Sequence, residues 1–166
     1  ILILSEIPHE YVDRLLDANL TPTVYTYELA QIISDIAKQR NVTAKIHIKI
    51  DTGMGRVGVL ANDAFLLIRK IFGLPNIKIE GVFTHFAKAD DKRSSYTKKQ
   101  FNTFISIIDE LRKEGINPLI KHAANSAAAL LRPETHLDMV RIGICMYGLY
   151  PFYTRKKLDI KPVLSF

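Results

Sequence analysis

Short apolar runs alternate with amphipathic segments along the whole chain, and this alternation limits the possible folds more than any other feature of the sequence. The runs typical of β-strands lie at 1–4, 22–26, 45–51, 79–86, 120–126 and 139–145, and a helical pattern fills each gap. Strands that alternate with helices form parallel sheets with right-handed connections. A chain of 166 residues has room for one domain of this class and at most the beginning of a second.

The helical segments carry their own start and stop signals. Their periodicity predicts helices over 7–16 and 29–36, one from 62–63 to 72, a long one from 94–97 to 115, and a short one over 125–131. Asn62, Asp63, Asn125 and Ser126 are candidate N-caps, because their side chains can accept a bond from a free N–H group of the first turn.

The segment at 45–51 separates the two architectures that fit this pattern, an open doubly wound sheet and a (β/α) barrel. Its residues alternate between an apolar and a polar face: Ile46, Ile48 and Ile50 against Lys45, His47, Lys49 and Asp51. A central strand of an open sheet is apolar on both faces, whereas a barrel strand turns one face to the interior. An edge strand with one face in water would show the same alternation, but this strand is the third of six.

We therefore predict an α/β fold that is a partial (β/α)8 TIM-type barrel. A complete barrel has eight strands and about 250 residues, so this chain can supply about six of the eight. Functional side chains of such barrels lie at the carboxyl ends of the strands. The single cysteine, Cys145, excludes an intrachain disulfide and suits a reducing compartment. No apolar run reaches the roughly 18 residues of a membrane span.

The chain is basic, with 23 Lys and Arg residues against 17 Asp and Glu residues and a pI near 9.4. The excess gathers at 88–99 and at 155–161. One interpretation is a nucleic-acid-binding domain, for which a pI above about 9 is typical, although few aromatic residues accompany the clusters. Solvated basic surfaces or a site for an anionic small molecule explain the same excess.

A glycine-rich loop at 51–58 follows the third expected strand. Its spacing Gly53-x-Gly55-x-x-Gly58 matches the dinucleotide-binding fingerprint, which leaves an NAD-dependent oxidoreductase as an alternative function. That fingerprint needs a helix to begin inside the glycine run, whereas helical signals here begin only near position 62. As a loop at a barrel mouth, the segment would turn tightly and leave Arg56 to reach into a pocket.

Further polar residues lie at the other strand ends. His85 is near the end of its strand, and Asn125 and Ser126 close the next one, where they could cap a helix or contact a phosphate. Arg141 lies inside an apolar run, where an unpaired guanidinium is too costly to bury, so it needs an acceptor or an anion as a partner. Gly143, two residues later on the same face, leaves space beside it.

Four segments together resemble the alanine racemase family of fold-type III pyridoxal-phosphate (PLP) enzymes. They are KIDTGMGRVG at 49–58, GVFTHFA at 81–87, HAANSA at 122–127 and VRIGICMYG at 140–148. The resemblance covers the whole chain and implies a PLP-binding (β/α)8 barrel, of which this sequence would begin at about the third strand. It also implies an isomerase that interconverts L-alanine and D-alanine by two-base proton exchange at Cα. Such an enzyme serves D-alanine biosynthesis for the cell wall as a cytoplasmic homodimer, without nucleic acid or membrane.

The resemblance assigns roles in cofactor binding. Arg141 resembles the Arg that bonds the pyridine nitrogen of PLP and, because it keeps its own proton, leaves that nitrogen unprotonated. His85 matches the residue that lies against the pyridine ring. Ser126, together with backbone groups of Gly143 and Ile144, matches the site of the cofactor phosphate.

Three more residues complete the site that the resemblance implies, which contains no metal. Asn125 borders the phosphate site. Arg56 matches the substrate-binding Arg, which bonds the phenolic oxygen of the cofactor and helps bind the substrate carboxylate. Lys49 matches a Lys that many family members carry as N6-carboxylysine, and we expect this carbamate to pair with Arg56.

The resemblance places both catalytic bases outside the sequence, so we expect no catalytic residue within it. One is the Lys that holds PLP as a Schiff base, on the first strand of the barrel; the other is a Tyr in the partner subunit's C-terminal β-domain. We expect residues 1–158 to form the partial barrel and 159–166 to begin that β-domain. This piece alone would then be inactive. Whether the substrate is alanine, serine or a broad set of amino acids stays open.

Overall fold

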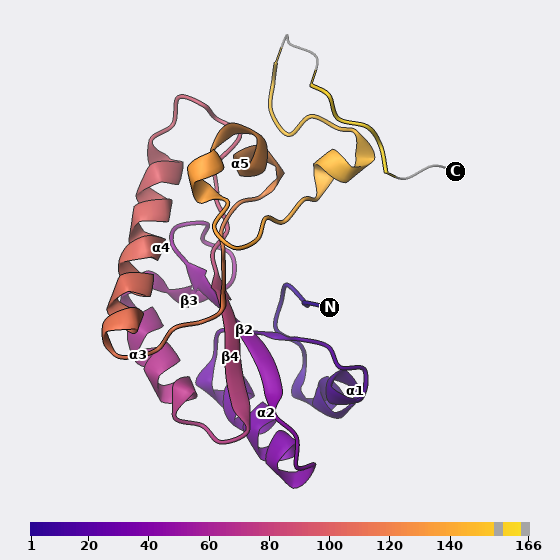
Figure 1. Cartoon of the computed structure of the whole chain (residues 1–166), viewed down its shortest axis with the longest axis vertical. Coiled ribbons are helices and arrows are strands. Elements are labelled where there is room, and N and C mark those ends of the chain that lie inside the picture. The colour runs from indigo at the N-terminus through magenta and orange to yellow at the C-terminus, as the bar shows by residue number, and fades with distance from the viewer. Residues whose placement is uncertain (155–157, 164–166) are drawn as a thin grey trace.

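The computed structural model describes residues 1–154 and 158–163, and it contains a parallel sheet with helices packed around it (Figure 1). The strands are β1 (Thr23–Val24), β2 (Ala44–Asp51), β3 (Val59–Leu60), β4 (Ile77–Phe83) and β5 (Ile120–His122). Their order is β1-β2-β4-β5, with β3 paired to the end of β2, and each of these pairings is parallel. The predicted α/β fold is confirmed, as part of the sheet of a barrel.

Helices connect the successive strands. They are η1 (His9–Tyr11), α1 (Val12–Asp17), α2 (Tyr27–Gln39), α3 (Ala61–Phe72), α4 (Tyr96–Lys113), α5 (Ser126–Leu131), η2 (Pro133–Thr135) and η3 (Ile144–Tyr147). In Figure 1, α3 and α4 stand together on one side of β4, and the segment that follows α5 extends away from the sheet. The expected helix over 7–16 is divided between η1 and α1.

The expected strand at 1–4 is wrong. Leu2 forms a single parallel bridge with Thr21. Beyond this bridge, the Thr23 hydroxyl donates to the Ile3 carbonyl oxygen (2.6 Å), at the place where the next backbone bond of a ladder would lie. A side chain therefore replaces the ladder after one bridge.

The expected strand at 139–145 is wrong as well, since only Met139 bridges to β5. The Arg141 N–H donates to the Ala124 carbonyl oxygen (2.9 Å), beyond the end of β5. Gly143 then leaves extended geometry, with φ −116° and ψ −94°, and η3 begins at the next residue. The other four expected strands are confirmed, in shortened form, as β1, β2, β4 and β5.

The expected helices from 94–97 and over 125–131 are confirmed as α4 and α5. Asn125 is the N-cap of α5, because its Oδ1 accepts a bond from the Ala128 N–H (3.0 Å). The expected cap of α3 is wrong. That helix begins directly after Leu60, the last residue of β3, so Asn62 and Asp63 lie in its first turn instead of ahead of it.

β2 has the two faces that its sequence predicts. Ile46 and Ile48 are fully buried in the apolar core that α2 and α3 help to form. On the opposite face, His47 and Lys49 are also buried, at 2% and 4% exposed. Because β2 lies between β1 and β4, the alternative of an edge strand with a wet face is wrong, and the polar face is turned into the protein.

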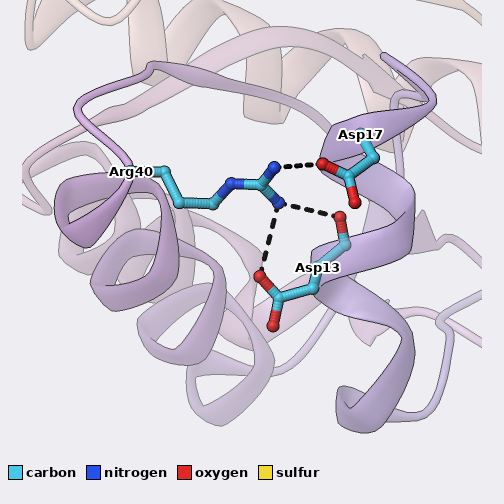
Figure 2. A network of polar contacts seen from close by, with 3 residues as sticks. All are labelled: Asp13, Asp17 and Arg40. Carbon is cyan, nitrogen blue, oxygen red and sulfur yellow. Dashed lines mark hydrogen bonds and ion pairs between the residues drawn. The ribbon is translucent and has the colours of Figure 1, made fainter.

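An exposed network of charges joins the first two helices (Figure 2). Arg40, the C-cap residue of α2, donates from Nη1 to the carbonyl oxygen (2.9 Å) and to Oδ1 (3.3 Å) of Asp13. Its Nη2 pairs with Oδ1 of Asp17. Both carboxylates belong to α1 and lie at the surface, so this network ties α1 to the end of α2.

The last described residues, 158–163, form no helix or strand. The expected beginning of a β-domain at 159–166 stays a prediction, because 164–166 lie outside the described residues. The basic residues at 155–157 lie outside them too. Within the described ranges, no helix is both long enough and apolar enough to cross a membrane.

Candidate functional site

A cavity of about 450 Å³ opens at the carboxyl ends of β2, β4 and β5. It is lined by every residue that the family resemblance assigns to the site: Lys49, Arg56, His85, Asn125, Ser126, Arg141, Gly143 and Ile144. Phe83, Phe86 and Asp90 also line it, without an expected role. Side chains that are far apart in the sequence thus meet at the end of the sheet where barrels carry their active sites.

Arg141 is held by the ring of His122 and by two backbone carbonyls. Its Nη1 donates to His122 Nδ1 (2.8 Å), and its Nη2 donates to the carbonyl oxygens of Thr84 (2.7 Å) and Ala123 (3.1 Å). The expectation that this Arg needs acceptors is therefore confirmed. Burial lowers the pKa of Arg141 to about 10, so the guanidinium stays charged at neutral pH and can only donate hydrogen bonds.

Phe83, the last residue of β4, forms an aromatic wall of the cavity. Its ring stacks on that of His122, with centroids 4.6 Å apart and 9° between the planes. Arg141 Cζ lies 5.1 Å and Lys49 Nζ lies 5.6 Å from the centroid of the Phe83 ring. The negative face of an aromatic ring attracts cations, so Phe83 helps to keep two positive charges beside the cavity.

His85 lies two residues after the end of β4. Its Nδ1 is 3.4 Å from Arg141 Nη2. Burial, and after it the positive charges of Arg141, Lys49 and Arg56, lower the pKa of His85 to about 4. The imidazole is therefore neutral at physiological pH and offers a flat, uncharged ring to the cavity.

Ser126 and Gly143 join two segments at another wall of the cavity. Ser126 is the first residue of α5, and its Oγ accepts a bond from the Gly143 N–H (2.9 Å). The preceding Asn125 donates from Nδ2 to the Phe86 carbonyl oxygen (3.4 Å). Since Gly143 uses Oγ only as an acceptor, the Ser126 hydroxyl proton can still be donated to a ligand.

Asp51 organises the glycine-rich loop. Its carboxylate accepts bonds from the N–H groups of Gly53 (2.8 Å), Met54 (2.7 Å) and Gly55 (2.9 Å). Burial alone would raise the pKa of Asp51, but these backbone bonds lower it overall. Gly53 and Gly55 have φ values of +131° and +69°, which favour glycine. The ordered loop carries Arg56 to the cavity.

α4 holds this loop in place through Tyr96 and Gln100, which had no expected role. The Tyr96 hydroxyl donates to the Gly53 carbonyl oxygen (2.9 Å), and a Cβ at Gly53 would overlap that hydroxyl. Gln100 is fully buried and donates to the His85 carbonyl oxygen (3.1 Å) and to Thr52 Oγ1 (3.3 Å). A glutamine among the apolar positions of an amphipathic helix is the sequence signal that could have revealed Gln100.

The lining of the cavity carries more positive than negative charge. Its cations are Lys49, Arg56 and Arg141, and its carboxylate is Asp90. Lys49 is 4% exposed, and no carboxylate of the described residues forms an ion pair with it. Burial, followed by the charges of Arg56 and Arg141, lowers the pKa of Lys49, although Asp51 opposes the shift. A buried positive charge without an ion-pair partner favours an anionic ligand.

Residues 1–151 match the family model described as alanine racemase, N-terminal domain. The chain belongs to the alanine racemase family. The match extends over all the elements from η1 to η3. It confirms the resemblance of the four sequence segments, and the partial sheet is that of the alanine racemase barrel.

Similar proteins carry the same family name. The chain is 48% identical to the alanine racemase of Clostridium tetani, over 99% of this chain and 43% of that protein. Among solved structures it resembles the alanine racemase of Clostridium difficile 630 in complex with cycloserine (TM-score 0.92, 40% identity, 98% of this chain and 45% of that one). It also resembles the alanine racemase of Bacillus anthracis with bound L-Ala-P (TM-score 0.80, 36% identity, 100% and 42%). The chain therefore spans less than half the length of these relatives.

The alternative functions find no support in alanine racemase relatives or in the site. No helix begins inside the glycine-rich loop, because β3 follows it and α3 begins only at Ala61, so a pyrophosphate would meet no helix N-terminus there. The basic cluster at 88–99 is interrupted by Asp90 and Asp91. In the part of the chain that the structure describes, no group of three or more His, Cys, Asp or Glu side chains could hold a metal ion.

Proposed function

We propose that this chain forms the cofactor-holding part of a PLP-dependent alanine racemase, an isomerase that interconverts L-alanine and D-alanine by two-base proton exchange. One observation carries the proposal: three cations surround a cavity lined by every residue that the family resemblance assigns to PLP and substrate. PLP has a phosphate and a phenolic oxygen, and the amino-acid substrate adds a carboxylate. Several anionic groups would therefore meet the excess positive charge.

The residues present fit PLP. The Ser126 hydroxyl and the backbone around Gly143 meet at the start of α5, where donors could serve the phosphate, with Ile144 and Asn125 at its border. His85 offers an uncharged ring to the pyridine ring. Arg56 would bond the phenolic oxygen and the substrate carboxylate through its planar fork of donors.

PLP supplies an electron sink that makes the Cα proton of a bound amino acid acidic. Arg141 would bond the pyridine nitrogen as a donor only. Because it keeps its own proton, Arg141 leaves that nitrogen unprotonated, which moderates the sink and favours proton exchange at Cα over transamination. The bonds from Arg141 to His122, Thr84 and Ala123 fix the guanidinium for this task.

We further propose that Lys49 carries a carbamate. The neutral amine attacks CO2, an N–C bond forms, a C=O π pair becomes the carboxylate charge, and the amine proton leaves to water. The lowered pKa of Lys49 increases the fraction of the neutral amine that can react, and the product would pair with Arg56. Native mass spectrometry in bicarbonate buffer should find the added mass of one CO2, and a bare amine under these conditions would contradict the proposal.

Both catalytic bases come from beyond this chain in the proposal: a Lys that binds PLP covalently and a Tyr of a second subunit. The relatives extend to more than twice the length that the chain covers, which leaves room for both. The intact protein would then be a cytoplasmic homodimer that makes D-alanine for the cell wall. The 166 residues alone would not racemise an amino acid.

Circular dichroism of L-alanine, incubated with the intact protein that carries this chain, tests the proposal. The signal should decay to zero as equal amounts of the two enantiomers form, and removal of PLP should stop the decay. L-serine assayed in parallel decides the side-chain specificity. A folded intact protein that binds NAD in place of PLP and leaves L-alanine unchanged would contradict the proposal.

A further inference from the structure

Three side chains lead from Arg141 away from the cavity, toward the opposite end of the sheet: His122, His47 and Glu80. We propose that His47 and Glu80 are positioning residues for Arg141, which act through His122 along a chain of polar contacts of fixed direction. The direction follows from the distances between these groups and from the burial of both rings. Its consequence for the cofactor rests on the proposed function.

The direction begins at Arg141, because a guanidinium donates hydrogen bonds and cannot accept them. Its Nη1 lies 2.8 Å from His122 Nδ1, so this nitrogen is the acceptor. His122 is fully buried, and burial, followed by the charge of Arg141, lowers the pKa of His122 to about 2. The ring is therefore neutral, and its single N–H proton is on Nε2.

The next link transfers this direction to His47. His122 Nε2 lies 2.9 Å from His47 Nδ1. Since His122 carries its proton on Nε2, His47 Nδ1 accepts the bond, and a neutral His47 carries its own proton on Nε2. Burial lowers the pKa of His47 although Glu80 opposes the shift, and the neutral ring is favoured.

Glu80 ends the chain. His47 Nε2 faces Glu80 Oε2 at 3.7 Å, an electrostatic contact that suits a nitrogen with a proton. The other oxygen of Glu80 pairs with Lys45 Nζ at 3.0 Å. With a guanidinium at one end and a carboxylate at the other, both imidazoles carry their proton on Nε2. In the reverse arrangement, the proton on Nδ1 of His122 would face the N–H groups of Arg141.

Packing keeps both rings in place. A Cβ at Gly81 would overlap the His47 imidazole, so glycine at this position makes room for the ring. The register between β2 and β4 shifts between Ile46 and His47, where His47 lies opposite Gly81. The ring of Phe83 stacks on the ring of His122. The contacts that set the tautomers are therefore built into the strands themselves.

The consequence concerns the donors of Arg141. A guanidinium has five N–H groups, and three of those of Arg141 bond His122, Thr84 and Ala123. A proton on His122 Nδ1 would oppose the guanidinium and displace it. His47 and Glu80 thus select the form of His122 that holds Arg141 ready for the pyridine nitrogen.

Nitrogen-15 NMR of the intact, cofactor-free protein with labelled histidine tests the direction of the chain. Single substitutions of His47 and His122 assign the ring nitrogens of these two residues. We expect both His47 and His122 as neutral Nε2–H forms at neutral pH, with His9 as a solvent-exposed reference ring. A proton on Nδ1 of His122, or a positively charged His122, would overturn the proposal.

A matched pair of variants tests the positioning role. His47→Asn keeps an amide oxygen near the place of Nδ1 as an acceptor for His122, whereas His47→Leu has a similar shape and no acceptor. We expect His47→Leu to weaken PLP binding by about tenfold and His47→Asn to restore most of this loss. Equal PLP affinities in the two variants would overturn the role of His47.

Glu80→Leu provides a second test that does not depend on the folding of the His47 variants. It should raise the Nδ1–H population of His47 in the NMR spectrum, whereas Lys45→Met, which keeps the carboxylate, should leave it unchanged. An unaltered His47 tautomer in Glu80→Leu would exclude Glu80 from the chain. If the intact protein shows the expected tautomers but binds no PLP, the proposed function is refuted and the direction of the chain still holds. If it binds PLP but shows the reversed tautomers, the direction of the chain is refuted and the proposed function still holds.

Discussion

The two ends of the inner face of β2 carry the same residue type in opposite surroundings. At the amino end, Lys45 is exposed and its Nζ pairs with Glu80 at 3.0 Å. At the carboxyl end, Lys49 is 4% exposed and lies near Arg56 and Arg141, and no carboxylate of the described residues pairs with it. The two lysines are four residues apart, about 13 Å along a strand.

This difference separates what stabilises the fold from what binds a ligand. At the amino end, the chain itself supplies the counter-charge. At the carboxyl end, the buried charge of Lys49 has no ion-pair partner among the described residues and destabilises the free protein, so a negatively charged ligand or modification would relieve it. Barrels in general carry function at the carboxyl ends of their strands and stability at the amino ends. Variants at the two ends should therefore respond differently to the cofactor.

The largest effect is expected from Arg141→Ala at the carboxyl end. The substitution leaves His122 Nδ1 and two carbonyl oxygens without their donor, so the free energy of unfolding should fall by about 3 kcal/mol, and PLP binding should be lost. Urea denaturation of the cofactor-free protein measures the stability, with Arg14→Ala on the exposed side of α1 as the control. A loss no larger than that of the control would show that the protein does not need Arg141 when no ligand is bound.

Asp51→Asn tests whether the loop at the carboxyl end depends on a charge. The pKa of Asp51 is lowered in the folded state, so its carboxylate contributes stability above the unfolded pKa of about 3.9, and this contribution is lost as the pH falls through the folded pKa. At neutral pH the variant should lose about 1 kcal/mol, with allowance for solvent screening. Its unfolding free energy should also fall less steeply in acid. Asp138→Asn, another carboxylate with a lowered pKa, is the control that lies away from the loop, and identical acid profiles for parent and Asp51→Asn would refute the role of the charge.

Lys49→Met and Lys45→Met compare the two ends directly. In CO2-free buffer without PLP, Lys49→Met should raise the free energy of unfolding by about 1 kcal/mol, because it removes a buried cation that two others repel. Lys45→Met should lower it by about 0.5 kcal/mol or less, because it breaks a largely exposed pair. Urea denaturation checks both. If both substitutions changed the free energy of unfolding in the same direction, the proposed difference between the two ends of β2 would be wrong.

Arg40→Ala should have the smallest effect. The network of Arg40 with Asp13 and Asp17 is exposed, so salt screens it and side-chain ordering opposes it. We expect a thermal midpoint close to that of the parent, with the small difference fading at high salt, and unchanged PLP affinity. A PLP affinity that falls with Arg40→Ala would show that the surface of α1 and α2 communicates with the cavity.

The polar faces of strands could be predicted from sequence because they follow a period of two. The alternation of Lys45, His47 and Lys49 against isoleucines indicated a polar face turned inward, and in the structure His47 and Lys49 of this face are buried while Lys45 at its end is exposed. The strand at 139–145 could not be excluded in the same way. Its residues have strand propensity, but the backbone of Arg141 bonds a loop carbonyl and Gly143 changes direction, which are tertiary contacts.

The positions of the site residues could be predicted, but their partners could not. Arg141 signalled a need for acceptors because it lies in an apolar run, yet nothing in its neighbourhood in the sequence identifies His122 or Thr84 as those acceptors. They depend on how β4 and β5 are paired. Gln100 was missed for the same reason, since its bonds to Thr52 and His85 connect a helix to loops that are distant in the sequence.

The visible absorbance of the intact protein that carries this chain tests the central claim most directly. After incubation with PLP and exhaustive dialysis, the protein should keep a visible band, and borohydride should bleach it. Arg141→Ala, prepared in parallel, should lose the band on dialysis. A folded, intact protein that stays colourless after PLP treatment would contradict the claim that the carboxyl end of this sheet is a PLP site.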